Sequence, residues 1–129
     1  MATTPAVPFW DEGNTITCHA SEALTGKRFV HVSGPRTDGN PTVDHSVGAA
    51  GKRVLGVTAR DAASGEKVSV YSAPGLVMPV TTAEAISAGA LVYSDADGKA
   101  VDTQPTGALV AGIALDDAAD GADCPIKLA

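Results

Sequence analysis

The sequence predicts an all-β fold, a small barrel or sandwich of about eight short strands formed by an internal duplication. Three observations favour this fold class. The 14 Gly and 8 Pro among 129 residues break the chain often and leave little room for long helices. Short runs rich in Val, Ile and Leu recur between these breaks, which is typical of strands. Two ordered blocks of the first half also recur in the second half.

The recurring blocks define the duplication. Residues 13–30 align with residues 75–92 at an offset of 62, and residues 54–70 align with residues 110–126 at an offset of 56. The second pair of blocks shares six identical positions, four of them within an Asp-Ala-Ala-x-Gly motif. The offset falls by six because the segment 34–52, rich in Gly, Pro, Asp and Asn, is longer than its counterpart. We interpret it as a connecting loop.

This alignment predicts the domain organisation. Residues 1–12 lie outside the repeat and are expected to form an extended N-terminal arm, because proline favours extended backbone. Residues 13–129 are expected to form a single duplicated β domain, with repeat 1 over about 13–72 and repeat 2 over about 75–128. Neither half buries much surface alone, so we expect both halves to share one core.

Each repeat is expected to contribute four short strands, with at most one or two helical turns in the chain. One such turn is expected at residues 83–87, where Thr82 can act as a cap. Asp-to-Gly segments at 61–65, 95–98 and 117–121 predict turns, because Asp accepts backbone N–H bonds and Gly adopts positive φ. The expected strands cover residues 15–18, 28–32, 53–59, 67–72, 77–81, 91–93, 108–115 and 124–128.

Charge and hydropathy exclude several function classes. The net charge is −6, and no basic cluster exceeds the pairs Lys27-Arg28 and Lys52-Arg53. We therefore predict no direct nucleic-acid binding and no attachment to an acidic membrane surface. The first 13 residues lack the basic and apolar regions of a signal peptide, and no apolar run approaches the ~20 residues of a membrane span. We expect the chain to be made and kept in a cytoplasm.

Residues that could carry chemistry do not form a recognisable site. Cys18 aligns with Val80 and Cys124 aligns with Val68, which favours two buried, reduced thiols, although a disulfide between them stays open. The three histidines show no metal-binding spacing, and the acidic loops lack the pattern of a calcium loop. The sequence therefore predicts no catalytic, cofactor-binding or metal-binding residue and no enzyme.

The arm carries the candidate binding residues. Phe9 and Trp10 are adjacent and flanked by Pro5, Val7 and Pro8, in a chain whose aromatic content is only 4%. Trp is enriched at binding hot spots, and an extended arm can add a strand to a partner's sheet. We predict that these five residues bind a partner protein. The alternative is that Phe9 and Trp10 fold back and close the end of the barrel.

Several motifs of the chain resemble those of the capsid cement, or head-decoration, proteins of tailed bacteriophages, especially of the actinophage type. The shared motifs are a short arm before a Gly-x-x-hydrophobic strand, Ala-Ile-x-x-Gly-x-x-Val at 85–92, Gly-Val-x-x-x-Asp-Ala-x-x-Gly-Glu-x-Val at 56–68, and Gly-Ile-Ala-Leu-Asp-x-Ala-x-x-Gly at 112–121. One departure is Pro125, which should place the last strand at a sheet edge or leave its ring nitrogen facing solvent.

The resemblance implies a structural role. Such a protein would bind the outer surface of an assembled phage head, contact the major capsid protein and stabilise its subunits. It would associate with itself, as a homotrimer at three-fold or quasi-three-fold positions, and would need no cofactor. The resemblance also implies a place in the virion, after assembly in the host cytoplasm.

Two other functions stay open at this stage. A small carbohydrate- or ligand-binding β module is the main alternative, although Phe29, Tyr71 and Tyr93 offer few aromatic contacts for a sugar. An enzyme is the other, but the sequence contains no constellation that supports one.

Overall fold

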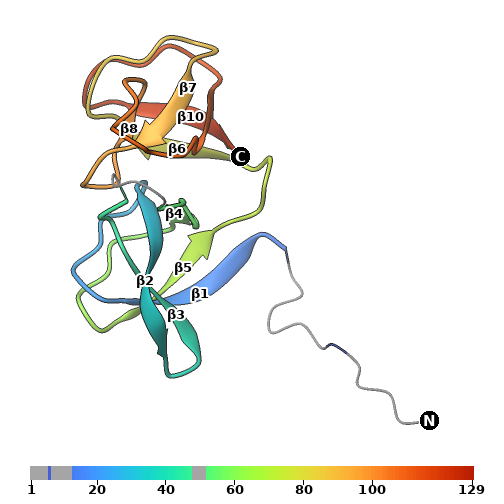
Figure 1. Ribbon diagram of the computed structural model, residues 1–129, viewed down its shortest axis with the longest axis vertical. Coiled ribbons are helices and arrows are strands. Elements are labelled where there is room, and N and C mark those ends of the chain that lie inside the picture. Colours follow the sequence, from blue (N-terminus) through green and yellow to red (C-terminus); the bar gives the residue numbers. More distant parts are fainter. Residues whose placement is uncertain (1–5, 7–12, 48–51) are drawn as a thin grey trace.

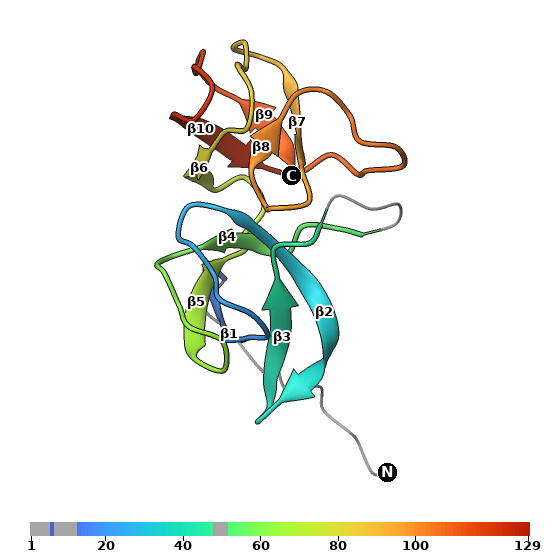
Figure 2. The same ribbon diagram turned by 90° about the vertical axis from the view of Figure 1, so that its left-hand side faces the viewer.

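The computed structural model describes residue 6, residues 13–47 and residues 52–129, and these residues form ten strands. No helix occurs within them, which confirms the all-β prediction. Figures 1 and 2 show the strands gathered into two bodies, one for each half of the chain. The strands are β1 (Thr15–Ala20), β2 (Phe29–Thr37), β3 (Asn40–Asp44), β4 (Gly56–Thr58), β5 (Lys67–Tyr71), β6 (Val77–Thr81), β7 (Leu91–Ser94), β8 (Ala100–Val101), β9 (Gly112–Ala114) and β10 (Asp123–Leu128).

The first sheet is a closed barrel with the order β1-β3-β2-β4-β5. Its neighbours run antiparallel except β1 and β3, which are parallel and close the barrel. Successive residues of a strand face opposite sides of a sheet, so the buried residues alternate with more exposed ones: Cys18 and Ala20 in β1, Val68 and Val70 in β5. The buried cluster of this half consists of Cys18, Ala20, Leu24, Val30, Val43, Ala62, Val68 and Val70.

The second sheet has the order β6-β10-β9-β7-β8. It therefore repeats the neighbour relations of β1, β5, β4, β2 and β3, and a parallel bridge between Thr82 and Ala100 lies where β1 and β3 meet in the first half. About eight strands in one barrel or sandwich were expected; the structure has ten strands in two sheets. The turn expected at residues 83–87 is not helical, because Ile86 forms a β-bridge with Ala118.

The register of the strands is also shared by the two halves. When two residues of the first half pair across strands, the residues that align with them in the second half pair as well. The aligned residues lie 62 or 56 positions later, which are the offsets of the two sequence blocks. The corresponding cross-strand pairs are Cys18–Val68 with Val80–Cys124, Thr58–Val70 with Ala114–Ile126, and Phe29–Val57 with Leu91–Ile113.

The segment interpreted as a loop, residues 34–52, is partly a hairpin. Strand β2 continues to Thr37 and returns as β3 through Asp38 and Gly39, both at positive φ (51° and 79°). Two successive residues at positive φ are typical of the tight turns that match strand twist. The loop prediction is therefore wrong for residues 34–44, whereas residues 48–51 of the same segment lie outside the described part of the chain.

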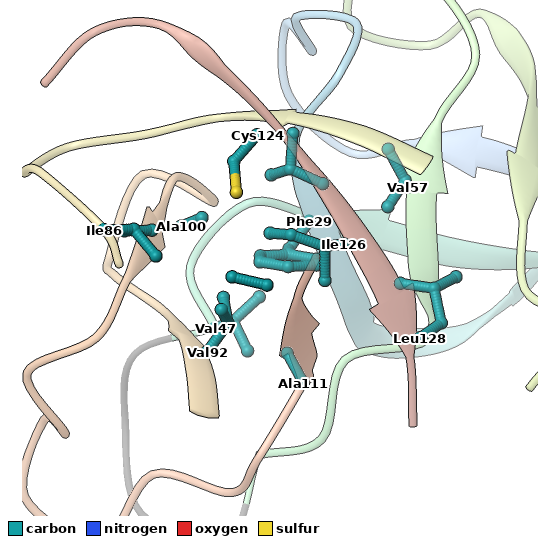
Figure 3. Packing of buried hydrophobic residues seen from close by; sticks show 12 residues of the cluster. Phe29, Val47, Val57, Ile86, Val92, Ala100, Ala111, Cys124, Ile126 and Leu128 are labelled. Atoms are coloured by element: carbon teal, nitrogen blue, oxygen red, sulfur yellow. The ribbon is translucent and has the colours of Figure 1, made fainter. Parts of the chain in front are cut away.

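The two halves meet around Phe29. This side chain is fully buried and packs, together with Val47 and Val57 of the first half, into a cluster whose other members come from the second half. Figure 3 shows Phe29 beside Ile126 in the middle of this cluster. The remaining members are Val80, Ile86, Val92, Ala100, Ala111, Ala114, Cys124 and Leu128.

Candidate interaction surfaces

The binding residues expected on the arm cannot be placed against this fold. Pro5, Val7, Pro8, Phe9 and Trp10 lie outside the described residues. The described chain resumes at Gly13, and the carbonyl of Asn14 accepts a hydrogen bond from the backbone N–H of Ser72 at 3.0 Å. The role of the arm stays a prediction.

Two of the histidines have structural partners. His45 is buried, and its Nε2 accepts a hydrogen bond from the backbone N–H of Thr25 at 2.9 Å. Because Nε2 is an acceptor, the ring proton lies on Nδ1, which donates to the Phe29 carbonyl at 2.9 Å. The ring thus fixes the strand end that carries Phe29. His31 lies beside Asp44, with 2.6 Å between Nε2 and Oδ1.

Both cysteines are buried and free. Cys18 lies opposite Val68 and Cys124 lies opposite Val80, so each thiol occupies a strand position inside its own half. Burial raises the pKa of the Cys18 thiol to about 12. Burial also raises the pKa of Cys124, and the negative charge of Asp116 adds to the effect. A thiol held in its protonated form is a poor nucleophile and a poor metal ligand.

Two acidic side chains, Glu84 and Asp102, approach each other. Oε1 of Glu84 accepts hydrogen bonds from the backbone N–H groups of Asp102 (2.9 Å) and Thr103 (2.8 Å), and the Thr103 bond is the main cause of a lowered pKa at Glu84. A hydrogen bond to Glu84 raises the pKa of Asp102. Over residues 13–47 and 52–129, no group of three or more His, Cys, Asp or Glu side chains is arranged to hold a metal ion.

The outer face of the second sheet carries exposed apolar side chains. A row across β6, β10, β9 and β7 consists of Val77, Lys127, Ile113 and Leu91, each paired with the next. Val77, Ile113 and Leu91 are 47%, 42% and 50% exposed. We call this row, together with Val110, the β7–β9 face.

Apolar side chains continue beside this row. Pro79 and Pro125 lie opposite each other on β6 and β10, and the N–H of Leu115 donates to the carbonyl of Pro125 at 2.9 Å. Leu115 is itself 50% exposed. β10 lies between β6 and β9, so the first of the two alternatives expected for Pro125, an edge strand, is wrong. The backbone N–H that Pro125 lacks would lie just past the end of β9, where the hydrogen-bond ladder between β9 and β10 stops.

A concave site lies on the β7–β9 face. It has a volume of about 250 Å³ and is lined by Leu91, Val110, Gly112, Ile113, Lys127, Leu128 and Ala129. Gly112 is a site of close backbone approach, because a Cβ there would overlap the carbonyl oxygen of Lys127. Large exposed apolar patches with a polar rim are typical of protein-binding surfaces.

Another concavity lies on the first half. Its volume is about 390 Å³, and it is lined by His31, Val32, Lys52, Arg53, Val54 and Leu55. Lys52 and Arg53 place two positive charges beside the apolar Val32, Val54 and Leu55 in this concavity. The second half, by contrast, has a net negative charge.

Charge is divided unequally between the halves. Residues 13–72 contain seven Lys and Arg against five Asp and Glu, a net charge of +2. Residues 75–128 contain two Lys against eight Asp and Glu, a net charge of −6. An ion pair joins the halves, with 2.8 Å between Nζ of Lys27 and Oδ2 of Asp123.

The β7–β9 face was not predicted from the sequence. A signal was present in the run Ala108-Leu109-Val110-Ala111-Gly112-Ile113-Ala114-Leu115, which is apolar at every position. A strand with one face in solvent alternates apolar and polar residues, so a strand that is apolar on both faces indicates a second covered surface.

Comparisons with known proteins agree with the resemblance. The model of one protein family, described as phage cement protein, matches residues 10–128. A solved structure, the head fiber gp8.5 N base of bacteriophage phi29, superposes with a TM-score of 0.71 at 22% identity, over 89% of this chain and 92% of that chain. At this identity the superposition shows a shared fold. No curated protein matches the chain, and no helix among the described residues is long and apolar enough to cross a membrane.

Proposed function

The chain belongs to the phage cement protein family, a family of structural proteins of the phage capsid, and we propose that it binds the outer surface of a phage head and stabilises contacts between major capsid protein subunits. The family match over residues 10–128 is the observation that carries this proposal. The resemblance noted in the sequence to cement proteins is thereby confirmed at the level of the family.

The architecture suits a clamp. A shared apolar cluster holds the two halves together, and backbone hydrogen bonds join the strands within each half. Because such an interior is closely packed, the body can transmit force without large rearrangement. Many copies that each contribute a modest interface stabilise a shell collectively, because every further contact of an attached copy is intramolecular.

Attachment is assigned to the arm. Pro5, Val7, Pro8, Phe9 and Trp10 precede the β body and would anchor it in the major capsid protein, with the two aromatic side chains as the buried contacts. In this proposal the protein associates with itself as a homotrimer at three-fold or quasi-three-fold positions. It assembles in the host cytoplasm and remains in the virion.

Co-sedimentation with phage heads tests attachment. Purified protein is added to mature and immature heads stripped of it, and the bound fraction is measured against protein concentration. We expect saturable binding to mature heads at a fixed ratio to major capsid protein. Absence of binding to both kinds of head would overturn the proposal and favour a ligand-binding module.

A variant separates the arm from the body. Trp10→Ala should fold normally, because the arm lies outside the repeat, and should weaken binding to heads about tenfold or more. Ala6→Ser is the matched control on the same arm and should bind as the unchanged protein does. Normal attachment of Trp10→Ala would show that the arm is not the anchor.

A further inference from the structure

Two buried side chains of the first half have exposed counterparts in the second half, and a third, Val54, is partly buried where its counterpart is exposed. Phe29 and Val57 pair across β2 and β4 and are fully buried, and Val54 packs against the same cluster. The matching residues are Leu91, Ile113 and Val110, which are 50%, 42% and 37% exposed. Backbone hydrogen bonds beside these residues also correspond. The N–H of Leu55 donates to the carbonyl of Val30, and the N–H of Ala111 donates to the carbonyl of Val92.

The first-half residues are buried because another body of the same fold covers them. The backbone N–H of Phe29 donates to the Gly98 carbonyl in the β7–β8 turn at 2.7 Å. The N–H of Thr81 donates to the carbonyl of Lys27 at 2.9 Å, and the Lys27–Asp123 ion pair lies beside it. This face of the fold thus packs against a second five-stranded body, through apolar contacts and backbone hydrogen bonds together.

The second-half residues have no such cover within the described chain. They form the β7–β9 face and line its 250 Å³ concavity. Burying the exposed parts of three aliphatic side chains is favourable at roughly 25 cal/mol for each Å² removed from water. By the precedent of the first half, the body that fits this face is another one of the same fold.

Charge decides which body of a second copy is favoured. The β7–β9 face belongs to the half with net charge −6, and the first half of a second copy carries +2. Two second halves packed face to face would repel each other and would also bring both Lys127 side chains into one interface. Packing of unlike halves avoids both costs.

We propose that Leu91, Val110 and Ile113 form the docking surface for the first half of a second copy of this chain. This inference rests on the self-association in the proposed function and names the surface that performs it. The contact joins different surfaces of the two copies, so it is heterologous, and it produces a closed ring wherever the rotation between copies closes.

Isotope-mixed cross-linking tests which halves meet. Unlabelled and ¹⁵N-labelled full-length protein are mixed, treated with an amine-reactive cross-linker, and the links between differently labelled copies are identified by mass spectrometry. Lys127 lies within the β7–β9 face, whereas Lys27, Lys52 and Lys67 belong to the first half. We expect mixed-isotope links from Lys127 to first-half lysines. Links between two Lys127 residues alone would overturn the proposal in favour of face-to-face packing.

Two charge-introducing variants give the matched comparison. Ile113→Lys places a cation in the docking surface and should raise the dissociation constant of self-association about tenfold or more in analytical ultracentrifugation. Leu91→Lys is a second test if the first variant folds poorly. Ala85→Lys adds the same charge at an exposed position between β6 and β7 and should leave self-association unchanged. Unchanged association of both face variants, folded by circular dichroism, would overturn the proposal.

The same measurements separate this inference from the proposed function. A protein that binds heads but stays monomeric, without mixed-isotope links, would overturn the docking surface and self-association while attachment stands. The β7–β9 face would then be free for the major capsid protein or for the arm. A protein that self-associates through this face but does not bind heads would retain the inference about the face and contradict attachment.

Discussion

Phe29 and Leu91 show how one position of this fold acts differently in the two halves. Phe29 is the first residue of β2, and Leu91 is the first residue of β7. Each pairs with an aliphatic residue, Phe29 with Val57 and Leu91 with Ile113. Phe29 fills a cluster of second-half side chains, whereas Leu91 is half exposed. The exposure of the side chain at this position therefore depends on whether another five-stranded body packs on that face.

Phe29→Ala should destabilise the protein by about 3–5 kcal/mol, because it removes a fully buried aromatic side chain and leaves a cavity where the two halves meet. Leu91→Ala should change stability by no more than about 0.5 kcal/mol in the monomer, since its side chain is half exposed. Urea unfolding of both variants under monomeric conditions checks this. Equal effects would contradict the assignment of buried and exposed positions.

The ion pair between the halves predicts a pH dependence. The hydrogen bond from Lys27 holds the pKa of Asp123 below its usual range. A carboxyl whose pKa is lowered on folding stabilises the folded state above its unfolded pKa of about 3.9 and loses that contribution as pH falls through the folded value. Asp123→Asn should therefore flatten the stability profile between about pH 5 and pH 2. Both groups face solvent, so the effect is small.

Lys27→Met supplies the control for this pair. Once the cation is removed, adding Asp123→Asn should change the acid limb of the profile much less than it does in the presence of Lys27, measured by urea unfolding at several pH values. An equal flattening in the presence and absence of Lys27 would mean that the pKa of Asp123 is set by another group, such as the Thr81 hydroxyl, which donates to Oδ1 at 3.0 Å.

Alignment of the repeats predicted individual core residues well. Cys18 and Cys124 aligned with valines, and each lies opposite the valine that matches the other cysteine. Both thiols are free, so the open question of a disulfide is answered by their places in separate halves. The outward-facing residues could not be predicted in this way, because their burial depends on what packs against the sheet.

At the scale of elements, two glycines allow short strands to approach closely. A Cβ on Gly56 would overlap the carbonyl oxygen of Tyr71, and a Cβ on Gly112 would overlap that of Lys127. These are corresponding positions of β4 and β9, each beside the last strand of its half. The backbones of neighbouring strands therefore approach each other closely at both sites.

Gly112→Ala should destabilise the protein by about 2 kcal/mol or more, because the added methyl meets backbone that cannot move without breaking the β9–β10 ladder. Gly13→Ala is the matched control: its Cβ would meet nothing within 4 Å, and its backbone needs no positive φ. Thermal unfolding compares the two. A Gly112→Ala variant as stable as Gly13→Ala would contradict the β9–β10 register.

The turns were predicted more reliably than the strands between them. Gly65, Gly98 and Gly121 adopt positive φ in the three expected turns. Oδ1 of Asp61 accepts the N–H of Gly26, and Oδ1 of Asp117 accepts that of Ala88. The β2–β3 hairpin was missed because Pro41 within β3 disfavours a strand, and the pairing with β1 that secures it is between residues far apart in sequence.

At the scale of the whole molecule, we infer that the chain is a duplicated unit in which the first copy docks onto the second. Shared strand order, register and turn contacts support this inference, and the common cluster around Phe29 supports one domain over residues 13–129. The sequence indicated this duplication through two blocks that recur at offsets of 62 and 56. It could not indicate that each half forms its own sheet, because strands of equal character can pair within or between the halves.

The stabilisation of a phage head by this protein is the central claim. The most direct measurement heats mature heads, stripped of the protein or saturated with it, in the presence of a DNA-binding dye and records the temperature at which packaged DNA becomes accessible. Saturated heads should release DNA at a clearly higher temperature, and the shift should disappear when the protein is omitted or carries Trp10→Ala. Identical release temperatures for stripped and saturated heads, with binding verified by co-sedimentation, would contradict the account.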